Sequence, residues 1–320
     1  MRDTILFGDC RETLKEFDEK ARTCVTSPPY YGLRDYGGED KQIGQEQTPD
    51  EFIEQLVSVF REVKNVLTDD GTLWVNLGDS YYNYRPGKGQ SYPKQSVSKT
   101  KQDLPDKCNK RGNKLEGLKE KDLIGIPWLF AFAMRNDGWH LRQDIIWHKP
   151  NPMPESVRDR CTKAHEYIFL FSKNKKYYYN NEAIKEPAKD WGTRDRTNGK
   201  YHNEGTGLQP HSGLTKSYPT KNKRSVWTVT NKPYREAHFA TYPPDLIEPC
   251  ILAGSEVGDI VLDPFMGSGT TAAVAKALGR DYIGCELHED YGNLIQKRVQ
   301  EYKPVQEVAQ EPCINILDII

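Results

Sequence analysis

The clearest indication of the fold lies in residues 258–271, Gly258-Asp259-Ile260-Val261-Leu262-Asp263-Pro264-Phe265-Met266-Gly267-Ser268-Gly269-Thr270-Thr271. A turn leads into a short apolar strand, and the strand ends in a carboxylate. The glycines that follow allow the backbone to approach a ligand closely, and the small residues after Thr271 predict a helix. A second apolar strand then ends in Glu286. This order of strand, glycine loop, helix, strand and acid is typical of a nucleoside-binding half of a doubly wound α/β sheet, in which the acid binds ribose hydroxyls.

A second motif, Ser27-Pro28-Pro29-Tyr30, follows an apolar strand expected over 23–26. The amino group of cytosine or adenine is a poor nucleophile because its lone pair is delocalised into the ring. Acceptors aimed at its N–H bonds therefore stabilise the transition state more than the ground state. Ser27 offers a hydroxyl and Pro28 a carbonyl, and the prolines restrict the backbone that holds them. Tyr30 offers a face for stacking a base, worth about 1–3 kcal/mol.

These four residues, Ser27, Pro28, Pro29 and Tyr30, are the predicted catalytic residues. The alternative is a strand that ends in a proline turn with a surface tyrosine.

Together the two motifs resemble those of the amino-group DNA methyltransferases that use S-adenosylmethionine. The catalytic motif precedes the donor-binding motif, which is similar to the circularly permuted beta group of that family. Stretches 8–10, 138–151 and 165–168 also resemble segments of this group. The resemblance covers the chain except roughly 81–122 and 173–224. It implies a doubly wound, Rossmann-like α/β methyltransferase sheet with permuted motif order and an inserted target-recognition region.

The resemblance also implies a set of residues around the methyl donor, with Asp9 on its adenine and Glu286 on its ribose. His238 could act as a base, but direct transfer leaves an acidic ammonium that water can deprotonate, so a role in shaping the pocket is favoured. No metal is expected. The predicted donor-binding residues are Asp9, His238, Phe239, Ala240, Thr241, Asp263, Pro264, Phe265, Gly267, Ser268, Gly269, Thr270, Thr271 and Glu286.

The target base is less firmly indicated. Within the family, serine before Pro-Pro-Tyr is associated mainly with cytosine N4 methylation, and Asp or Asn with adenine N6. Cytosine N4 in flipped-out duplex DNA is therefore favoured, and adenine N6 stays open. Methylation of RNA or of a protein amine, or a DNA-binding module without catalysis, are further alternatives. Methylation of a ring carbon needs a cysteine nucleophile, and neither Cys250 nor another cysteine stands in a convincing position.

Composition is consistent with an intracellular enzyme. The chain has 320 residues, a net charge of −1 and seven dispersed cysteines. Without a Cys-x-x-Cys pair, this set fits a reducing cytoplasm better than a disulfide framework or a zinc site. The sequence has no apolar run of about twenty residues and no signal-peptide pattern, so a membrane protein or an exported one is not expected.

The small net charge hides two basic segments. Residues 84–121 hold eleven Lys/Arg against four Asp/Glu, and residues 173–235 hold fourteen against five. Basic stretches that also carry tyrosines suit contact with phosphates and bases, so double-stranded DNA is the expected partner. A cognate restriction endonuclease is a further candidate partner. The predicted DNA-binding residues are Lys173, Lys175, Lys176, Arg194, Arg196, Lys221, Lys223 and Arg224.

Coarse patterning divides the chain into segments. Thr48 and Glu51 form a capping box with a proline at the first helical position, which predicts an amphipathic helix behind it. Further helices are expected over 127–134 and 244–253, and strands over 4–7, 72–77 and 141–147. The predicted segments are 1–80 (catalytic part), 81–122 (basic mobile loop), 123–172 (continued methyltransferase domain), 173–224 (target recognition), 225–303 (donor binding) and 304–320 (tail).

Overall fold

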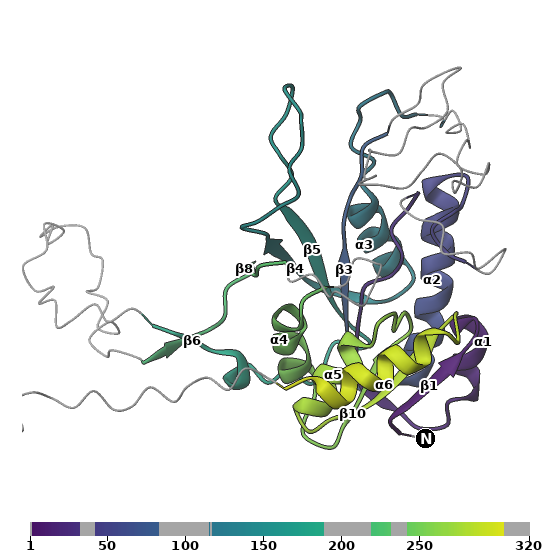
Figure 1. Ribbon diagram of the computed structural model, residues 1–320, viewed down its shortest axis with the longest axis vertical. Helices are drawn as coiled ribbons and strands as arrows, with labels where there is room; N and C mark the ends of the chain where they lie inside the picture. Colours follow the sequence, from purple (N-terminus) through teal and green to yellow (C-terminus); the bar gives the residue numbers. More distant parts are fainter. Residues whose placement is uncertain are drawn as a thin grey trace, which may run out of the picture.

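Helices cover both faces of an eight-stranded sheet in the computed structural model (Figure 1). The structure describes residues 2–32, 42–82, 115, 117–188, 219–231 and 242–303. The strands of the sheet are β1 (Thr4–Phe7), β2 (Ala21–Thr26), β3 (Leu67–Leu77), β4 (His140–His148), β5 (His165–Ser172), β8 (Val226–Thr228), β9 (Ile260–Asp263) and β10 (Asp281–Glu286). Among the described residues, no helix is both long and apolar enough to cross a membrane.

The strand order is β1-β10-β9-β2-β3-β5-β4-β8. Neighbouring strands from β1 to β3 run parallel, and β8 runs parallel to β4. Only β5 reverses, pairing antiparallel with both β3 and β4. The sheet is therefore mixed and mostly parallel, and the predicted α/β class with helices on both faces is confirmed.

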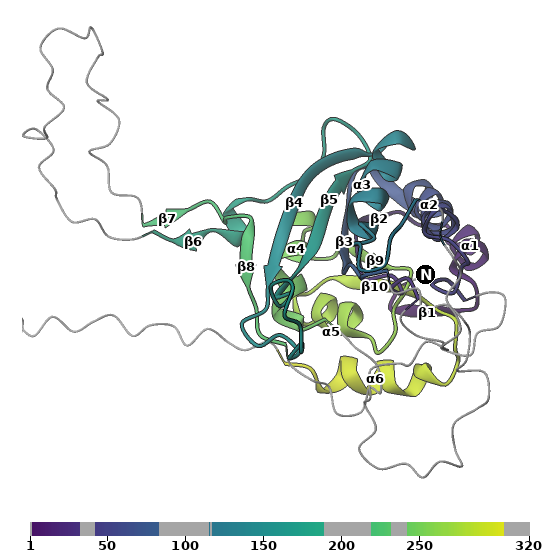
Figure 2. The same ribbon diagram turned by 90° about the horizontal axis from the view of Figure 1, so that it is seen from above.

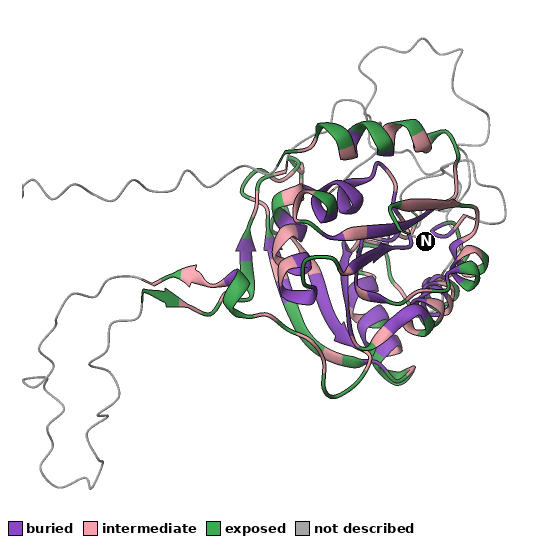
Figure 3. Cartoon of the chain, turned by 90° about the horizontal axis from the view of Figure 1, so that it is seen from below, coloured by how far each residue is buried: buried purple, intermediate pink, exposed green. Residues whose placement is uncertain are grey.

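The described helices lie on both sides of the sheet (Figure 2). One side carries α1 (Cys10–Thr13), α2 (Pro49–Val66) and α3 (Ile126–Asn136), and the other carries α4 (Pro244–Gly254), α5 (Thr270–Ala277) and α6 (Tyr291–Glu301). Neighbouring strand residues alternate between the two cores, as Cys24 and Val25 do in β2. Buried residues concentrate in the strands and in the inner helix faces, whereas α6 is largely exposed outside (Figure 3).

The local sequence specifies where helix α2 begins. The Thr48 hydroxyl accepts from the Glu51 backbone N–H, and the Glu51 carboxylate accepts from the backbone N–H of Thr48, which is the predicted capping box. The apolar face buries Phe52, Leu56 and Phe60. Strand β3 begins directly after α2, five residues before its expected start at Thr72, because Leu67 already pairs with Ala21 of β2.

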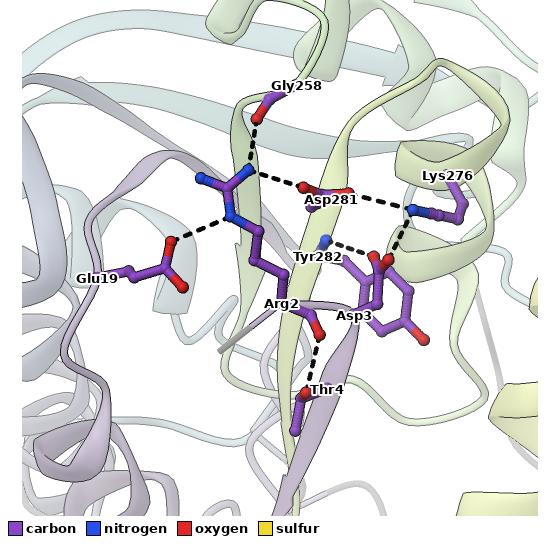
Figure 4. A network of polar contacts seen from close by, with 8 residues as sticks. All are labelled: Arg2, Asp3, Thr4, Glu19, Gly258, Lys276, Asp281 and Tyr282. Carbon is purple, nitrogen blue, oxygen red and sulfur yellow. Dashed lines mark hydrogen bonds and ion pairs between the residues drawn. The ribbon is translucent and has the colours of Figure 1, made fainter.

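A polar network holds the edge strand β1 against its neighbour β10 (Figure 4). The Arg2 guanidinium donates to Asp281 Oδ2 at 2.9 Å and to Gly258 O at 3.2 Å. Lys276 Nζ bridges Asp3 at 2.6 Å and Asp281 at 3.1 Å. These contacts hold β1 beside β10 at the end of the strands opposite to the motif loops.

A small hairpin projects from the other side of the molecule (Figures 1 and 2). It consists of β6 (Glu186–Pro187) and β7 (Thr220–Lys221), after the short 3-10 turn Glu182–Ile184. Another 3-10 turn, Leu14–Glu16, extends α1. The hairpin brackets the part of the predicted target-recognition segment that lies outside the described residues.

Candidate active site

The two sequence motifs meet at the carboxyl ends of adjacent strands. Ser27 directly follows β2, and Asp263 is the last residue of β9, which pairs with β2. From β2 the chain crosses by α2 to β3, whereas from β9 it crosses by α5 to β10 in the opposite direction. In doubly wound sheets, ligands bind at such a reversal, in the crevice beyond the carboxyl ends of the strands.

Asp263 anchors this junction. Its carboxylate is 1% exposed and accepts hydrogen bonds from Thr26 Oγ1 at 2.5 Å, Thr271 Oγ1 at 2.6 Å, and Tyr242 OH and the Phe265 N–H at 3.0 Å each. Burial raises the pKa of the Asp263 carboxyl, and the four donors act in the opposite direction. Because a carboxylate has about four lone-pair sites, Asp263 is saturated by the chain itself and holds the loop in place.

Two glycines shape the loop after Asp263, which is the predicted donor-binding loop. Gly267 and Gly269 adopt left-handed φ values of 54° and 82°. A Cβ at Gly267 would meet only Phe265 O at 3.9 Å, so the backbone there is open to a ligand. A Cβ at Gly269 would instead lie 2.8 Å from Ile295 Cγ2, because α6 packs against the loop. Glycine at position 267 thus leaves the backbone open to a ligand, and glycine at position 269 makes room for Ile295 of α6.

Buried contacts hold the other residues of the glycine loop in place. Ser268 is buried, and its hydroxyl accepts from Arg298 of α6. Thr270 and Thr271 are buried in the first turn of α5, and Pro264 is buried before it. Phe265 packs against Phe60 with ring centroids 6.5 Å apart.

The two acids predicted to hold the donor lie at the ends of β10 and β1. Glu286 Oε2 accepts from the Gly267 N–H at 2.8 Å and Oε1 from the His288 N–H at 3.1 Å, which leaves acceptor capacity on both oxygens. Burial raises the pKa of Glu286. Asp9 caps α1 and forms a fork with Arg11, whose Nε lies 2.9 Å from Oδ1.

The remaining predicted donor residues, His238, Phe239, Ala240 and Thr241, lie outside the described part of the chain. Tyr242, the next residue, donates to Asp263, and burial raises its pKa well above the usual value.

The predicted catalytic loop contacts a group of three polar residues that the sequence reasoning missed. Ser27 Oγ lies 3.4 Å from Asn76 Oδ1, and Tyr30 OH donates to Glu166 Oε2 at 2.7 Å. Glu166 also accepts from Lys149 Nζ. The Tyr30 ring packs on Gly78, where a Cβ would lie 2.6 Å from Tyr30 Cε2. Burial, followed by the Glu166 carboxylate, raises the pKa of Tyr30 well above its usual value.

A signal for these residues exists in the sequence. Asn76 interrupts the apolar strand around it, and Glu166 stands at the head of the apolar strand that continues to Phe171. A polar residue inside a buried strand requires a partner. The partner itself cannot be read from such a pattern.

Residues 21–297 match a family model described as DNA methylase. The chain belongs to the N6/N4 DNA methylase family. It is a site-specific DNA methyltransferase, and S-adenosylmethionine is its methyl donor.

Curated relatives of this DNA methylase span nearly its full length. It is 46% identical over 301 residues to the type II methyltransferase M.SmaI of Serratia marcescens, covering 92% of this chain and 90% of that protein. It is 45% identical over 298 residues to M.Cfr9I of Citrobacter freundii, covering 93% and 87%.

Solved structures share the fold. The PvuII DNA methyltransferase, a cytosine-N4-specific enzyme, aligns with a TM-score of 0.60 at 18% identity, covering 93% of this chain and 86% of that one. The complex of M1.HpyAVI with S-adenosylmethionine aligns with a TM-score of 0.51 at 19% identity, covering 92% and 98%.

The lysines that follow β5 and are predicted to touch DNA lie at the edge of the sheet opposite the two motif loops. Because β5 runs antiparallel, Ser172 pairs with Thr72 at the opposite edge, and Lys173, Lys175 and Lys176 follow there. Lys173 Nζ donates to Leu67 O at 2.9 Å and pairs with Asp69 at 3.2 Å. The Lys173 ammonium is therefore already engaged in contacts within the protein.

The other predicted DNA contacts lie on or near the projecting hairpin. Lys221, Lys223 and Arg224 gather around Glu186, at 3.9, 3.9 and 3.2 Å. Arg194 and Arg196 lie outside the described residues.

Tryptophans and Cys250 have packing roles in the methylase. Trp139 and Trp147 are buried in the core. Cys250 is 1% exposed within α4, and burial raises the pKa of its thiol. A buried, protonated thiol is a poor nucleophile, which argues against Cys250 in ring-carbon methylation.

Proposed function

We propose that this DNA methylase methylates the N4 amino group of cytosine in a base flipped out of duplex DNA. The observation that carries the proposal is the position of Ser27, a neutral hydroxyl at the tip of β2, one residue after the Thr26 contact with the donor-loop anchor Asp263. Serine at this position, rather than Asp or Asn, supports cytosine. The shared fold with the cytosine-N4-specific PvuII enzyme is consistent with it.

In this proposal the chain orients the amino group and stabilises its developing charge. Ser27 Oγ and the Pro28 carbonyl accept the two N–H bonds of the amino group, which turns the nitrogen lone pair toward the glycine loop. Tyr30 stacks on the extruded base. S-adenosylmethionine supplies an electrophilic methyl group when bound, with Glu286 on its ribose and Asp9 on its adenine. Water takes the proton from the ammonium product, so no side chain is needed as a base.

The glycine loop supports donor binding at this position. Gly267 presents open backbone, and Glu286 keeps free acceptor capacity beside it. The motif order, with Ser27 far ahead of Asp263, supports assignment to the permuted beta group. Residues 173–224 and the basic segment 81–122 are proposed as the parts that recognise the DNA target.

The described structure supports one further DNA contact. The loop over 149–164 joins the carboxyl end of β4 to the amino end of β5, so it rises from the catalytic edge (Figure 1). Asn151 and Asn231 tie it to the segment after β8 by a reciprocal pair of hydrogen bonds. Arg158 is exposed on this loop and has no partner among the described residues. We propose that it contacts a phosphate.

Two assignments concern the cellular setting. The relatives are type II methyltransferases, which supports a cognate restriction endonuclease as partner. The five described cysteines are all free, which supports a reducing, cytoplasmic location.

Mass spectrometry of nucleosides tests the proposal. Unmethylated duplex DNA is incubated with the protein and S-adenosylmethionine, then digested. N4-methylcytosine is the expected product. N6-methyladenine would overturn the choice of base and show that Ser27 does not select it, and no methylated nucleoside would overturn the proposed activity.

A further inference from the structure

Four strands converge beneath the catalytic loop and bring together side chains that the mechanism above does not use. Asn76 comes from β3, Glu166 from β5 and Lys149 from the residue after β4. They lie under Ser27 and Tyr30, which follow β2. The Lys149 and Glu166 side chains are only 16% and 15% exposed, so this is an ion pair largely removed from water.

The Glu166 carboxylate is shared among three donors. Its Oε2 accepts from Tyr30 OH at 2.7 Å and from Asn76 Nδ2 at 3.3 Å, and its Oε1 accepts from Lys149 Nζ. An ionised carboxylate only accepts hydrogen bonds. Every group that faces Glu166 must therefore present a hydrogen to it.

This requirement fixes the orientation of the Asn76 amide. Its Nδ2 donates to Glu166 and, at 3.1 Å, to the Tyr167 carbonyl, which also accepts only. Two acceptors on one side place the NH2 there, so Oδ1 faces the catalytic loop. Asn76 is 4% exposed, and water has little access to replace these partners.

The orientation of Asn76 in turn fixes the Ser27 hydroxyl. Asn76 Oδ1 can only accept a hydrogen bond, and it lies 3.4 Å from Ser27 Oγ and 3.3 Å from Tyr30 OH. Because Tyr30 OH donates its hydrogen to Glu166 at 2.7 Å, Ser27 is the donor to Asn76 Oδ1. Both lone pairs of Ser27 are then left for an incoming N–H. If Asn76 were reversed, its NH2 would donate to Ser27, and the serine hydrogen would point at the substrate amino group.

We propose that Glu166 and Lys149 are positioning residues that keep Ser27 an acceptor, acting through Asn76. The inference rests on the proposed role of Ser27 as acceptor for the amino group. Glu166 sets the direction of the hydrogen-bond chain, and Lys149 holds the Glu166 carboxylate in place. The same carboxylate holds the Tyr30 ring, so both contacts with the base depend on one ion pair.

Glu166→Gln tests this directly because it keeps the size of the side chain. The glutamine amide can donate to Asn76 Oδ1 and so allows Asn76 to turn around. With saturating donor and duplex, the single-turnover rate of methyl transfer should fall about 10–100-fold, the value of a hydrogen bond to a charged group. The affinity for S-adenosylmethionine, measured by calorimetry, should stay unchanged.

A double-mutant cycle separates positioning from general support. Asn76→Ala removes the relay, so adding Glu166→Gln to it should slow transfer far less than it does in the wild type. Fully additive effects would overturn the proposal. Glu19→Gln is the matched control, because it alters an ion pair with Arg2 at the opposite edge. It should leave the rate unchanged.

Lys149 gives a second route should Glu166→Gln fail to fold. Lys149→Gln should slow transfer, and Lys149→Arg, which retains the charge, should restore most of the rate. A Glu166→Gln or Lys149→Gln protein that loses thermal stability but transfers at the wild-type rate would overturn the inference. If the wild type makes N6-methyladenine, the choice of base fails, but a slowed Glu166→Gln still supports positioning.

Discussion

The hydroxyl of Thr26 donates a 2.5 Å hydrogen bond to the buried carboxylate of Asp263. This contact joins the strand that carries the catalytic loop to the strand that carries the donor loop. Both residues lie at the carboxyl ends of β2 and β9, so this buried polar contact adds to the pairing of the two strands in holding the two loops beside each other.

Thr26→Val should therefore weaken both stability and donor binding. Valine has the same shape but leaves Asp263 without one of its four donors, a loss of about 1–3 kcal/mol. Urea unfolding and calorimetric titration with S-adenosylmethionine measure the two effects. Thr23→Val is the matched control on the same strand: it breaks a buried 2.9 Å contact with Thr72 and should cost stability without changing donor affinity. Equal loss of affinity in both variants would contradict the assignment.

Gly269→Ala should destabilise the protein more than Gly258→Ala. Both glycines have φ between 80° and 90°, so both substitutions carry the cost of a left-handed residue, about 1–2 kcal/mol. At Gly269 the new methyl also meets Ile295, whereas at Gly258 it meets nothing within 4 Å. The extra cost of overpacking is about 1–3 kcal/mol. Equal melting temperatures would show that α6 yields freely at this contact.

Tyr30 variants should separate stacking from anchoring. Tyr30→Ala removes the face on which the base stacks, and base extrusion should weaken about 10–100-fold, as judged by 2-aminopurine fluorescence at the target position. Tyr30→Phe keeps the face and loses only the hydroxyl, with its contacts to Glu166 and Asn76, so extrusion should persist while transfer slows. Donor affinity should be unaffected in both. Normal turnover of Tyr30→Ala would exclude the stacking role.

The stability conferred by Glu286 should depend on pH in a defined direction. Burial raises its pKa in the folded state, so the folded protein binds a proton more readily than the unfolded chain does. This contribution is complete below the unfolded value, about 4.3, and is lost as pH rises through the raised folded pKa. Subtracting urea unfolding free energies of Glu286→Gln from those of the wild type across pH 4 to 8 isolates it. A difference that grows with pH would contradict the sign.

Arg158→Ala should reduce the salt dependence of DNA binding, whereas Lys173→Ala should not. A lost phosphate contact lowers the slope of log affinity against log salt by about 0.9. Lys173 lies at the opposite edge and is held by Leu67 O and Asp69, so its loss should affect stability only. The reverse pattern would place the duplex on the other edge of the sheet.

The sequence was sufficient for those parts of the fold and site that depend on neighbouring residues. The capping box of α2 and the glycine loop before α5 are local, because each is determined within a few positions. Glu166 and Tyr30 are separated by 136 positions, and only the packing of β5 beside β3 brings them together. The apolar pattern of β5 does not reveal that this strand runs antiparallel, so the sequence could not predict that Lys173 lies at the edge of the sheet opposite the two motif loops.

The pairing of β1 with β10 also has a consequence for folding. Thr4 pairs with Ile283, so two residues that are far apart in the sequence must meet before this edge of the sheet can close. Because such long-range pairing is slow to form, we expect β1 and β10 to be among the last strands of the sheet to pair.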